Sequence, residues 1–163
     1  MNKVFILFKR FLIILVFALS TNIYAQQIYL GNSNYDNNII FTISKGYIYK
    51  GNSTLNSHMI GYFDGKYLYK GQSKYQSNII LTYCGGKIYK GKSQYESDVV
   101  ANYKSGKLYD KTSSYNSNII ATIQNNKIYN GNSTYLGNIM CRSSGYIHPL
   151  IWYFILDNFI VLI

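Results

Sequence analysis

From residue 27 to residue 140 the chain repeats one arrangement of apolar and polar positions every twenty residues. Each unit holds a stretch such as I-Y-K-G-K-S-Q-Y, residues 88–95, whose odd positions form one face and whose even positions form the other, with Ile88 as an apolar exception. It also holds an apolar stretch such as residues 79–83, in which Thr82 points outward. The alternation, the β-branched and aromatic residues and the absence of a 3.6-residue stripe predict β-strands and exclude helices.

Four single-residue columns and one apolar pair recur in all six copies, and no copy contains an insertion. The first aromatic column is Tyr29, Tyr49, Tyr69, Tyr89, Tyr109 and Tyr129, and the Gly column two residues later is Gly31, Gly51, Gly71, Gly91 and Gly131, with Lys111 as the exception. The Ser column is Ser33, Ser53, Ser73, Ser93, Ser113 and Ser133, and the second aromatic column is Tyr35, Leu55, Tyr75, Tyr95, Tyr115 and Tyr135. The apolar pairs are Ile39-Ile40, Met59-Ile60, Ile79-Ile80, Val99-Val100, Ile119-Ile120 and Ile139-Met140. Such self-similarity indicates a repeat architecture.

Each apolar stretch is followed by a pair of residues that tolerate positive φ, as tight hairpin turns require. These pairs are Lys45-Gly46, Asp64-Gly65, Gly85-Gly86, Ser105-Gly106 and Asn125-Asn126. The unit is therefore predicted to be a β-hairpin, and because one hairpin is marginal in water, the hairpins must pack together. We expect the Tyr–Gly–Ser–Tyr face to be buried, with Gly and Ser leaving room for a close approach, and the Lys-bearing face to be solvated.

The repeat ends near Cys141, and residues 147–163 contain thirteen apolar residues among seventeen. Pro149 suits the first turn of a helix, and apolar residues on every side suit a fully buried one. Six hairpins supply twelve strands, and a closed ring of twelve is wider than its own side chains fill, so the tail is predicted to plug it. A membrane segment, which Asp157 disfavours, and a read-through tail are the alternatives.

The N-terminus predicts a secretory signal peptide over residues 1–25, with Lys3, Lys9 and Arg10 before an apolar core of nine residues and a small residue, Ala25, at the cleavage point. The alternative is a membrane anchor, but nine helical residues at ~1.5 Å each cover less than half of a ~30 Å hydrocarbon core. The predicted organisation is a signal peptide over 1–25, a hairpin domain over 26–146 and an apolar segment over 147–163 packed into that domain. We expect an extracytoplasmic location, secreted or periplasmic.

Export changes the expected chemistry of the chain. The full sequence carries a net charge of +10, and removal of the three basic residues of 1–25 leaves +7. This charge can attract anionic lipid or envelope polysaccharide, or it can simply keep an edge-rich β protein soluble and monomeric. Nucleic acid is not expected, because export and an even scatter of Lys both argue against it. Cys84 and Cys141 meet oxidising conditions, but their spacing does not decide whether they pair.

Catalytic chemistry is not apparent in the sequence. The six acidic residues are scattered over different copies, and only Glu96 and Asp98 are close, in a loop where they are expected to face solvent. His58 reads as a surface loop residue, and His148 lies beside Pro149 at the start of the tail. No cofactor motif, metal-ligand spacing or nucleophile–base pair is found, so an enzyme is not expected.

The second aromatic column supplies the candidate ligand contacts. Tyr75, Tyr95, Tyr115 and Tyr135 fall at hairpin loops, where an exposed ring can stack on a sugar. The alternative is that these rings pack against neighbouring hairpins. The other invariant positions are interpreted as structural.

The unit Y-x-G-x-S-x-Y-x-x-N-I-I, followed by a Gly or Asn turn and a Lys, resembles the β-flower proteins over residues 27–140. That resemblance implies a bacterial, rotationally symmetric barrel in which each hairpin is a petal, with an architecture similar to the barrel of tubby-like proteins, which surrounds a hydrophobic helix and binds phosphoinositide membranes. Lys111 and Leu55 depart from the pattern. Choline-binding cell-wall repeats and MORN repeats are also similar, but their Trp residues are missing here, because Trp152 lies outside the repeats.

The sequence therefore predicts an all-β protein of six 20-residue hairpin repeats closed into a symmetric barrel, with a C-terminal hydrophobic helix as its plug. We expect a secreted, non-enzymatic protein with a structural or interaction role at the cell envelope. The alternatives are a carbohydrate- or cell-wall-binding module and a protein that binds anionic lipid, because fold analogy alone does not transfer function.

Overall fold

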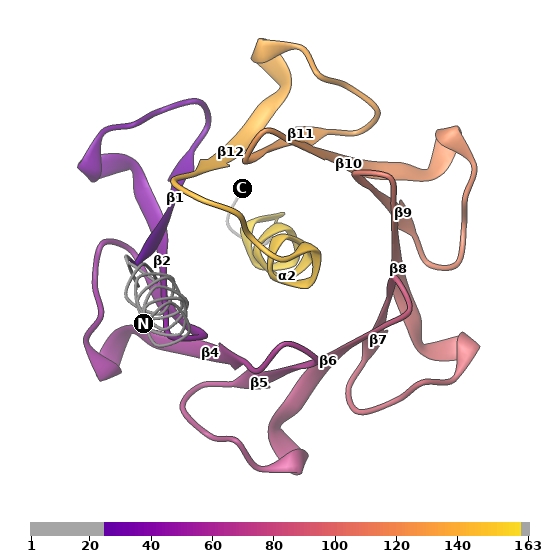
Figure 1. Ribbon diagram of the computed structural model, residues 1–163, viewed down its shortest axis with the longest axis horizontal. Coiled ribbons are helices and arrows are strands. Elements are labelled where there is room, and N and C mark those ends of the chain that lie inside the picture. Colours follow the sequence, from indigo (N-terminus) through magenta and orange to yellow (C-terminus); the bar gives the residue numbers. More distant parts are fainter. Residues whose placement is uncertain (1–24, 161–163) are drawn as a thin grey trace, which may run out of the picture.

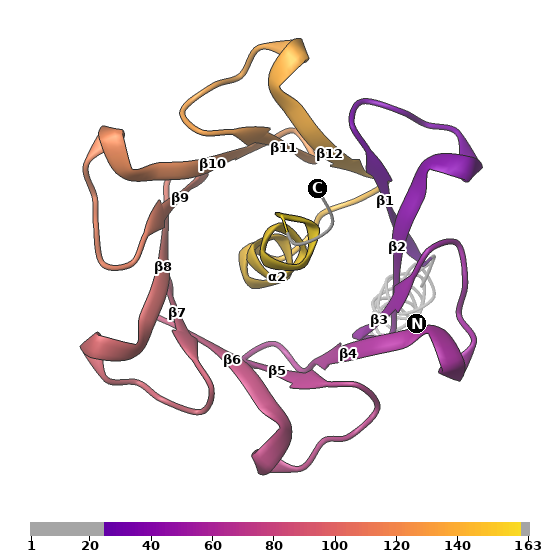
Figure 2. The same cartoon turned by 180° about the vertical axis from the view of Figure 1, so that it is seen from behind.

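The structure is a computed structural model that describes residues 25–160, with side chains to residue 158. The predicted signal peptide lies outside the described residues, apart from Ala25. The described part of the chain forms a closed ring of strands around one helix, with six loops projecting outward (Figures 1 and 2).

Twelve short strands build the ring, and each pairs antiparallel with both of its neighbours. The strands are β1 (Gln26–Leu30), β2 (Ile39–Ser44), β3 (Tyr47–Lys50), β4 (Met59–Phe63), β5 (Tyr67–Lys70), β6 (Ile79–Cys84), β7 (Lys87–Lys90), β8 (Val99–Lys104), β9 (Lys107–Asp110), β10 (Ile119–Gln124), β11 (Lys127–Asn130) and β12 (Ile139–Ser143). β1 pairs with β12 through Tyr29 opposite Arg142, so the sheet has no free edge. The predicted six-hairpin barrel is confirmed.

Two kinds of connection alternate around the ring. Tight turns at the predicted pairs, such as Gly85-Gly86, join one repeat to the next, and all residues of these pairs except Asp64 adopt positive φ. Eight-residue loops, which we call petals, join the two strands within a repeat and carry one turn of 3-10 helix each (Figure 1). These turns are η1 (Asp36–Asn38), η2 (Asn56–His58), η3 (Gln76–Asn78), η4 (Glu96–Asp98), η5 (Asn116–Asn118) and η6 (Leu136–Asn138).

The first aromatic column is buried, as predicted, but it lies on the outer side of the sheet, and the face that was predicted to be solvated turns toward the core. Ile88 is fully buried in the core, while Tyr89 is buried on the outer side of the sheet. The same holds in every repeat, since the core contains the corresponding Ile or Leu of all six: Ile28, Ile48, Leu68, Ile88, Leu108 and Ile128. The strand also ends at Lys90, earlier than expected, so Ser93 and Tyr95 belong to the petal. Ile88 was misassigned because it stands alone on a face whose other visible members are polar.

A β-bulge in each petal-bearing hairpin explains why the second residue of the apolar pair and the residue that follows it face the same side. Tyr89 lies opposite Val99 and Ile88 lies opposite Ala101, so Val100 is skipped. The equivalent residues Ile40, Ile60, Ile80, Val100, Ile120 and Met140 all pack against the core. A bulge lets two successive side chains face the same side of a sheet. Ile80 and Leu81 therefore both reach the interior, which a regular strand would not allow.

The residues of the Gly column adopt positive φ, and this conformation, not space for a neighbouring group, is the reason for Gly there. At Gly71 φ is +63°, and an added Cβ would meet nothing within 4 Å. The Gly71 N–H donates to the bulge carbonyl of Ile60 at 2.9 Å, which turns the chain out of the sheet and into the petal. The prediction that Gly permits a close approach at this column was therefore wrong, because the positive φ is what requires Gly here.

A buried hydroxyl ties the petal base to the sheet. Thr82 points outward, as predicted, yet it is fully buried, and its Oγ1 donates to the Gly91 carbonyl at 2.6 Å. Thr42 and Thr122 make the same bond to Gly51 and Gly131, both at 2.8 Å. Thr82 does face away from the barrel interior, but the petal covers it, which the alternation of the strand could not indicate.

The helix α2 (Pro149–Ile160) lies within the ring, as predicted for the plug (Figure 1). Leu150, Trp152 and Ile155 are almost fully buried and belong to one core cluster with the inward residues of the strands. The interior of a twelve-stranded ring is wider than its wall residues can fill, and the helix occupies that space. In the part of the chain that the structure describes, no helix combines the length and apolar character needed to span a membrane.

His148 begins the helix and is half-buried against the wall. Its Nδ1 accepts the Leu150 N–H at 3.2 Å, and its ring lies 4.7 Å from that of Phe63 and 4.5 Å from that of Tyr83. Desolvation lowers the pKa of His148 below its usual 6.5. Only a neutral imidazole can accept the Leu150 N–H at Nδ1, so the helix start depends on the uncharged form.

Exposed lysines of three repeats lie at the end of the barrel from which the petals start. Lys90 lies opposite Leu81, a core residue, so its side chain is on the inner face, at the rim where that strand ends. Lys50 and Lys70 hold the same place in their repeats. They are exposed, as predicted. Cations near the C-terminal end of a helix complement its partial negative charge.

The substitution Lys111→Gly tests the account of the Gly column. Lys111 has φ +50° and keeps the N–H bond to Val100 that Gly makes elsewhere, so its side chain is strained. Removing the Cβ should raise the free energy of unfolding by about 1 kcal/mol in urea denaturation. Gly71→Ala is the matched opposite and should lower it by a similar amount. An unchanged midpoint in both variants would contradict the account.

A second prediction concerns pH. Because the folded state holds His148 with a lowered pKa, the unfolded chain binds the proton first, and stability falls as pH drops below about 6.5. Above that pH the stabilisation is fully present, and the slope between the two pKa values approaches about 1.4 kcal/mol per pH unit. Urea unfolding at pH 7.5 and 5.5 should show the loss, and His148→Asn should flatten it. His58→Asn, which introduces the residue of Asn38 and Asn78, should leave the loss intact; equal slopes in both variants would contradict this.

Candidate functional site

The tips of the six petals form a ring of exposed apolar side chains, which we call the crown. Its members are Tyr35, Leu55, Tyr75, Tyr95, Tyr115 and Tyr135, with 65–81% of each residue exposed. Tyr75, Tyr95, Tyr115 and Tyr135 were the predicted ligand contacts, with packing against neighbouring petals as the alternative. Their exposure excludes that packing, and the ring architecture distributes them around the molecule instead of gathering them into one site (Figure 1).

The Ser column holds each crown residue in place. Ser73 Oγ accepts the Tyr75 N–H at 3.2 Å, and the same bond recurs in the other five petals. In the first petal Ser33 Oγ also accepts from Asn38 Nδ2 at 2.6 Å, which links the two ends of the 3-10 turn. Ser was expected to leave room for a close neighbour, but its hydroxyl is an acceptor that fixes the loop. The crown residues are thus presented by ordered loops.

A second aromatic surface lies on the outer face of β3, β4 and β5, and the sequence analysis did not identify it. We call it the tyrosine wall; its residues are Tyr47, Tyr49, Tyr62, Tyr67 and Tyr69. Neighbouring ring centroids are 4.7 Å apart for Tyr47 and Tyr62 and 6.0 Å apart for Tyr62 and Tyr69. Tyr49 and Tyr69 belong to the buried column, whereas Tyr47, Tyr62 and Tyr67 are half-buried and partly open to solvent.

Charged groups border the wall. The Lys74 ammonium lies 4.0 Å from the centroid of the Tyr62 ring and 5.4 Å from that of Tyr47, and the Lys66 ammonium lies 5.0 Å from that of Tyr67. Hydrogen bonding to the Tyr47 side chain, and then to that of Tyr62, outweighs desolvation and raises the pKa of Lys74. The Lys74 ammonium therefore stays charged while it lies over aromatic faces.

Asp64 holds the turn before β5 and the Tyr69 side chain of the wall. It accepts the N–H groups of Lys66 and Tyr67 at 2.9 and 2.7 Å and the hydroxyl of Tyr69 at 3.0 Å. These hydrogen bonds outweigh desolvation and lower the pKa of Asp64 below its usual 3.8. Its role is to hold the turn and the Tyr69 ring, so it is not a free acid or base.

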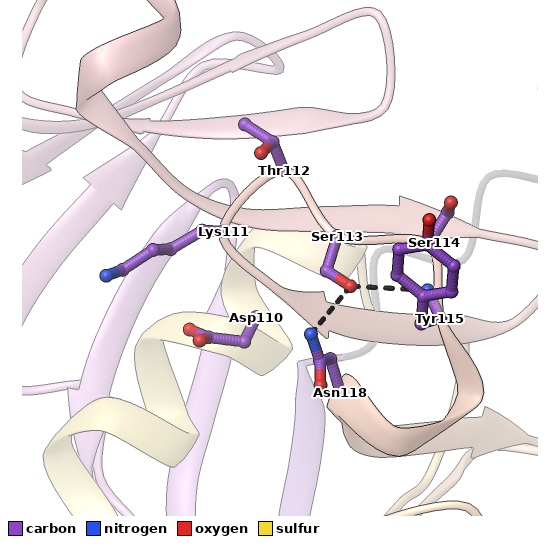
Figure 3. A pocket seen from close by; sticks show the side chains of 7 residues that line it. All are labelled: Asp110, Lys111, Thr112, Ser113, Ser114, Tyr115 and Asn118. Atoms are coloured by element: carbon purple, nitrogen blue, oxygen red, sulfur yellow. Dashed lines mark hydrogen bonds between the residues drawn. The ribbon is translucent and has the colours of Figure 1, made fainter.

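The fifth petal contains a shallow hollow of about 390 Å³ (Figure 3). Its lining is Asp110, Lys111, Thr112, Ser113, Ser114, Tyr115 and Asn118. Ser113 Oγ accepts from Asn118 Nδ2 at 2.9 Å and from the Tyr115 N–H at 3.2 Å, while Lys111 extends away from it. The hydroxyl is engaged in the loop and has no histidine beside it, so the hollow is not arranged for nucleophilic catalysis.

The remaining reactive residues are accounted for by local contacts. Glu96 forms an ion pair with Lys87 at 2.7 Å, and Asp98 accepts from the Ser93 hydroxyl. Cys84 is exposed and Cys141 is buried, both are free, and burial raises the pKa of Cys141 to about 12. Among residues 25–158 no group of three or more His, Cys, Asp or Glu side chains is placed to hold a metal ion. The two aromatic surfaces are thus the candidate binding features.

One signal in the sequence could have indicated the tyrosine wall. Tyr47 and Tyr67 occupy a column that carries Lys87, Lys107 and Lys127 in later repeats. Tyr62 occupies the column of Thr42, Thr82 and Thr122. Three aromatic departures in adjacent repeats, on strands that share a face, mark one sector of an otherwise regular ring. These three Tyr residues were missed because the prediction rested on the residues that recur in every repeat.

Comparison with known proteins agrees with the architecture. The sequence pattern of the family described as "6-fold beta flower protein" matches residues 48–148. No curated protein and no solved structure is significantly similar to the chain. The match covers more than half of the sequence, and the ring has the six petals that the family description implies. This chain is therefore a member of the 6-fold beta flower protein family.

Proposed function

We propose that this protein is an extracytoplasmic binding module for envelope polysaccharide, with no catalytic step of its own. The observation that carries the proposal is the crown, in which five Tyr and one Leu are held in water at corresponding places on six petals. Exposed, ordered Tyr rings offer a flat apolar face and a hydroxyl, which together suit the stacking of a sugar ring. A purely structural role would not require these aromatic side chains to be solvated.

The ring arrangement suits a long, repetitive ligand. A single Tyr stacked on a sugar binds weakly, but several contacts on one polymer act as an intramolecular set and raise the avidity. As a monomer the chain would present all six crown positions at once. The net charge of +7 after removal of residues 1–25 favours approach to an anionic envelope. The predicted signal peptide supports an extracytoplasmic location.

Absence of catalysis is consistent with the described residues. Glu96 is engaged in an ion pair, Asp98 in a contact with a hydroxyl and Asp64 in a turn. The beta flower family is not a known enzyme family. Anionic lipid is the second class of ligand that the charge allows, and it predicts binding that depends on Lys and not on the crown.

Sedimentation with purified cell-wall material tests the proposal. The triple variant Tyr75→Ala, Tyr95→Ala, Tyr115→Ala should lose at least about tenfold in apparent affinity, since each substitution removes one stacking face. Tyr146→Ala is the matched control, because Tyr146 is 68% exposed but lies outside the petals, and it should bind like the parent chain. Saturable binding that the triple variant retains in full would overturn the crown as the site, and flotation with anionic vesicles would then identify a lipid ligand.

A further inference from the structure

The tyrosine wall is not needed to close the ring. Other repeats fill the same outer positions with Lys, Thr or Asn, and their strands pair in the same register. Tyr47, Tyr62 and Tyr67 are nevertheless half-exposed, so part of each ring remains in contact with water. Aromatic area that the fold neither requires nor fully covers is typical of a surface that binds a ligand.

The wall has a defined shape and a defined charge. Tyr47 and Tyr62 are a cross-strand pair, and Tyr62 in turn lies opposite Tyr69, so rings from three strands form one surface. The interplanar angle of Tyr47 and Tyr62 is 43°, which makes a shallow angled floor. Lys74, from the third petal, lies over the Tyr62 ring of this floor, whereas Lys66, from the turn before β5, lies over the neighbouring Tyr67 ring. The wall therefore combines aromatic faces with cationic groups that lie over two of them.

Neither lysine has an acidic partner. In residues 25–158 the only ion pair is that of Lys87 and Glu96, on another part of the ring. The nearest carboxylate along the chain, Asp64, is occupied by three hydrogen bonds from its own turn and from Tyr69. A carboxylate brought by a ligand would supply the missing partners, and it would do so beside aromatic faces that exclude water from one side.

We propose that the tyrosine wall binds the acidic sugar units of a polysaccharide, with the pyranose ring stacked on Tyr47 and Tyr62 and the sugar carboxylate paired with Lys74, Lys66 or both. The inference rests on the proposed function and adds the substrate class: a polymer that contains uronic acid units. The crown then stacks on sugar rings whether or not they are charged, and the wall gives the protein its preference for acidic sugar units. The repeats with Lys in place of Tyr have charge but no floor.

The repeats themselves supply substitutions that the fold tolerates. Tyr47→Lys with Tyr67→Lys copies the residues at positions 87, 107 and 127, and Tyr62→Thr copies those at 42, 82 and 122. The double Tyr→Lys variant adds two positive charges while it removes two of the three half-exposed rings, including the Tyr47 half of the floor. Simple attraction between charges predicts tighter binding by this variant, whereas stacking on the wall predicts weaker binding. The two explanations thus differ in sign.

Affinity electrophoresis through gels that contain polygalacturonate, with neutral dextran as the comparison, measures the effect on the full chain. The parent should bind polygalacturonate more tightly than dextran, and Tyr47→Lys with Tyr67→Lys should weaken that binding at least about tenfold despite the added charge. Lys66→Gln with Lys74→Gln should weaken it more than Lys107→Gln with Lys127→Gln, which removes the same charge elsewhere on the ring. Circular dichroism melting verifies that each variant folds.

Three results would overturn the inference: equal binding to both polymers, unchanged or tighter binding by the double Tyr→Lys variant, or equal effects of the two double Lys→Gln variants. The crown test separates this failure from failure of the proposed function. If binding to cell-wall material still depends on Tyr75, Tyr95 and Tyr115 while the wall variants behave like the parent, the inference fails and the proposed function stands. If the crown variant also binds like the parent, both fail.

Discussion

The packing of the ring onto α2 is the contact on which the other features depend. Each repeat places one fully buried Ile or Leu on the inner wall, and the helix supplies the apolar volume that these side chains alone cannot fill. Neither part is stable by itself, because a hairpin is marginal in water and a short apolar helix is insoluble there. The bulges strengthen the arrangement, since each turns an extra apolar side chain toward the helix.

Polar interactions at the petal bases mark the boundary between the strands of the barrel and the petals. The positive-φ Gly, the N–H bond to the bulge carbonyl and the buried Thr hydroxyl define where each strand stops and each petal starts. Because these contacts use mostly backbone groups, many side chains of the petals and of the outer face are not needed to hold the fold together. This separation allows Tyr47 and Tyr67 to stand where Lys87 and Lys107 stand without altering the register.

The fold was more predictable from the sequence than the binding surfaces. The twenty-residue period, the turn pairs and Pro149 at the start of an apolar segment all report local backbone requirements, and closure follows from their number. Ile88 was misplaced because its burial comes from the helix, which is distant in sequence, and the burial of Thr82 was missed because it comes from the petal that folds over it. The alternation of polar and apolar residues allowed the Tyr75 ring either to be exposed or to pack against a neighbouring hairpin. Only the outward direction of the petals decides between these two alternatives. Tyr62 indicates a binding surface only when it lies beside Tyr47 and Tyr69. The strand register, which the sequence does not state, brings these three residues together.

The seam between β1 and β12 has a consequence for how the chain reaches its native state. Its bond from the Gln27 N–H to Ser144 joins residues 117 apart, while most other pairings join sequence neighbours. Contacts of such separation carry a large loop-closure entropy and form slowly. Until they form, the partly folded molecule is an open arc with two unpaired strand edges, the state from which β proteins aggregate or exchange strands with another copy. The symmetry that removes every edge from the finished ring therefore concentrates its folding risk in one late step.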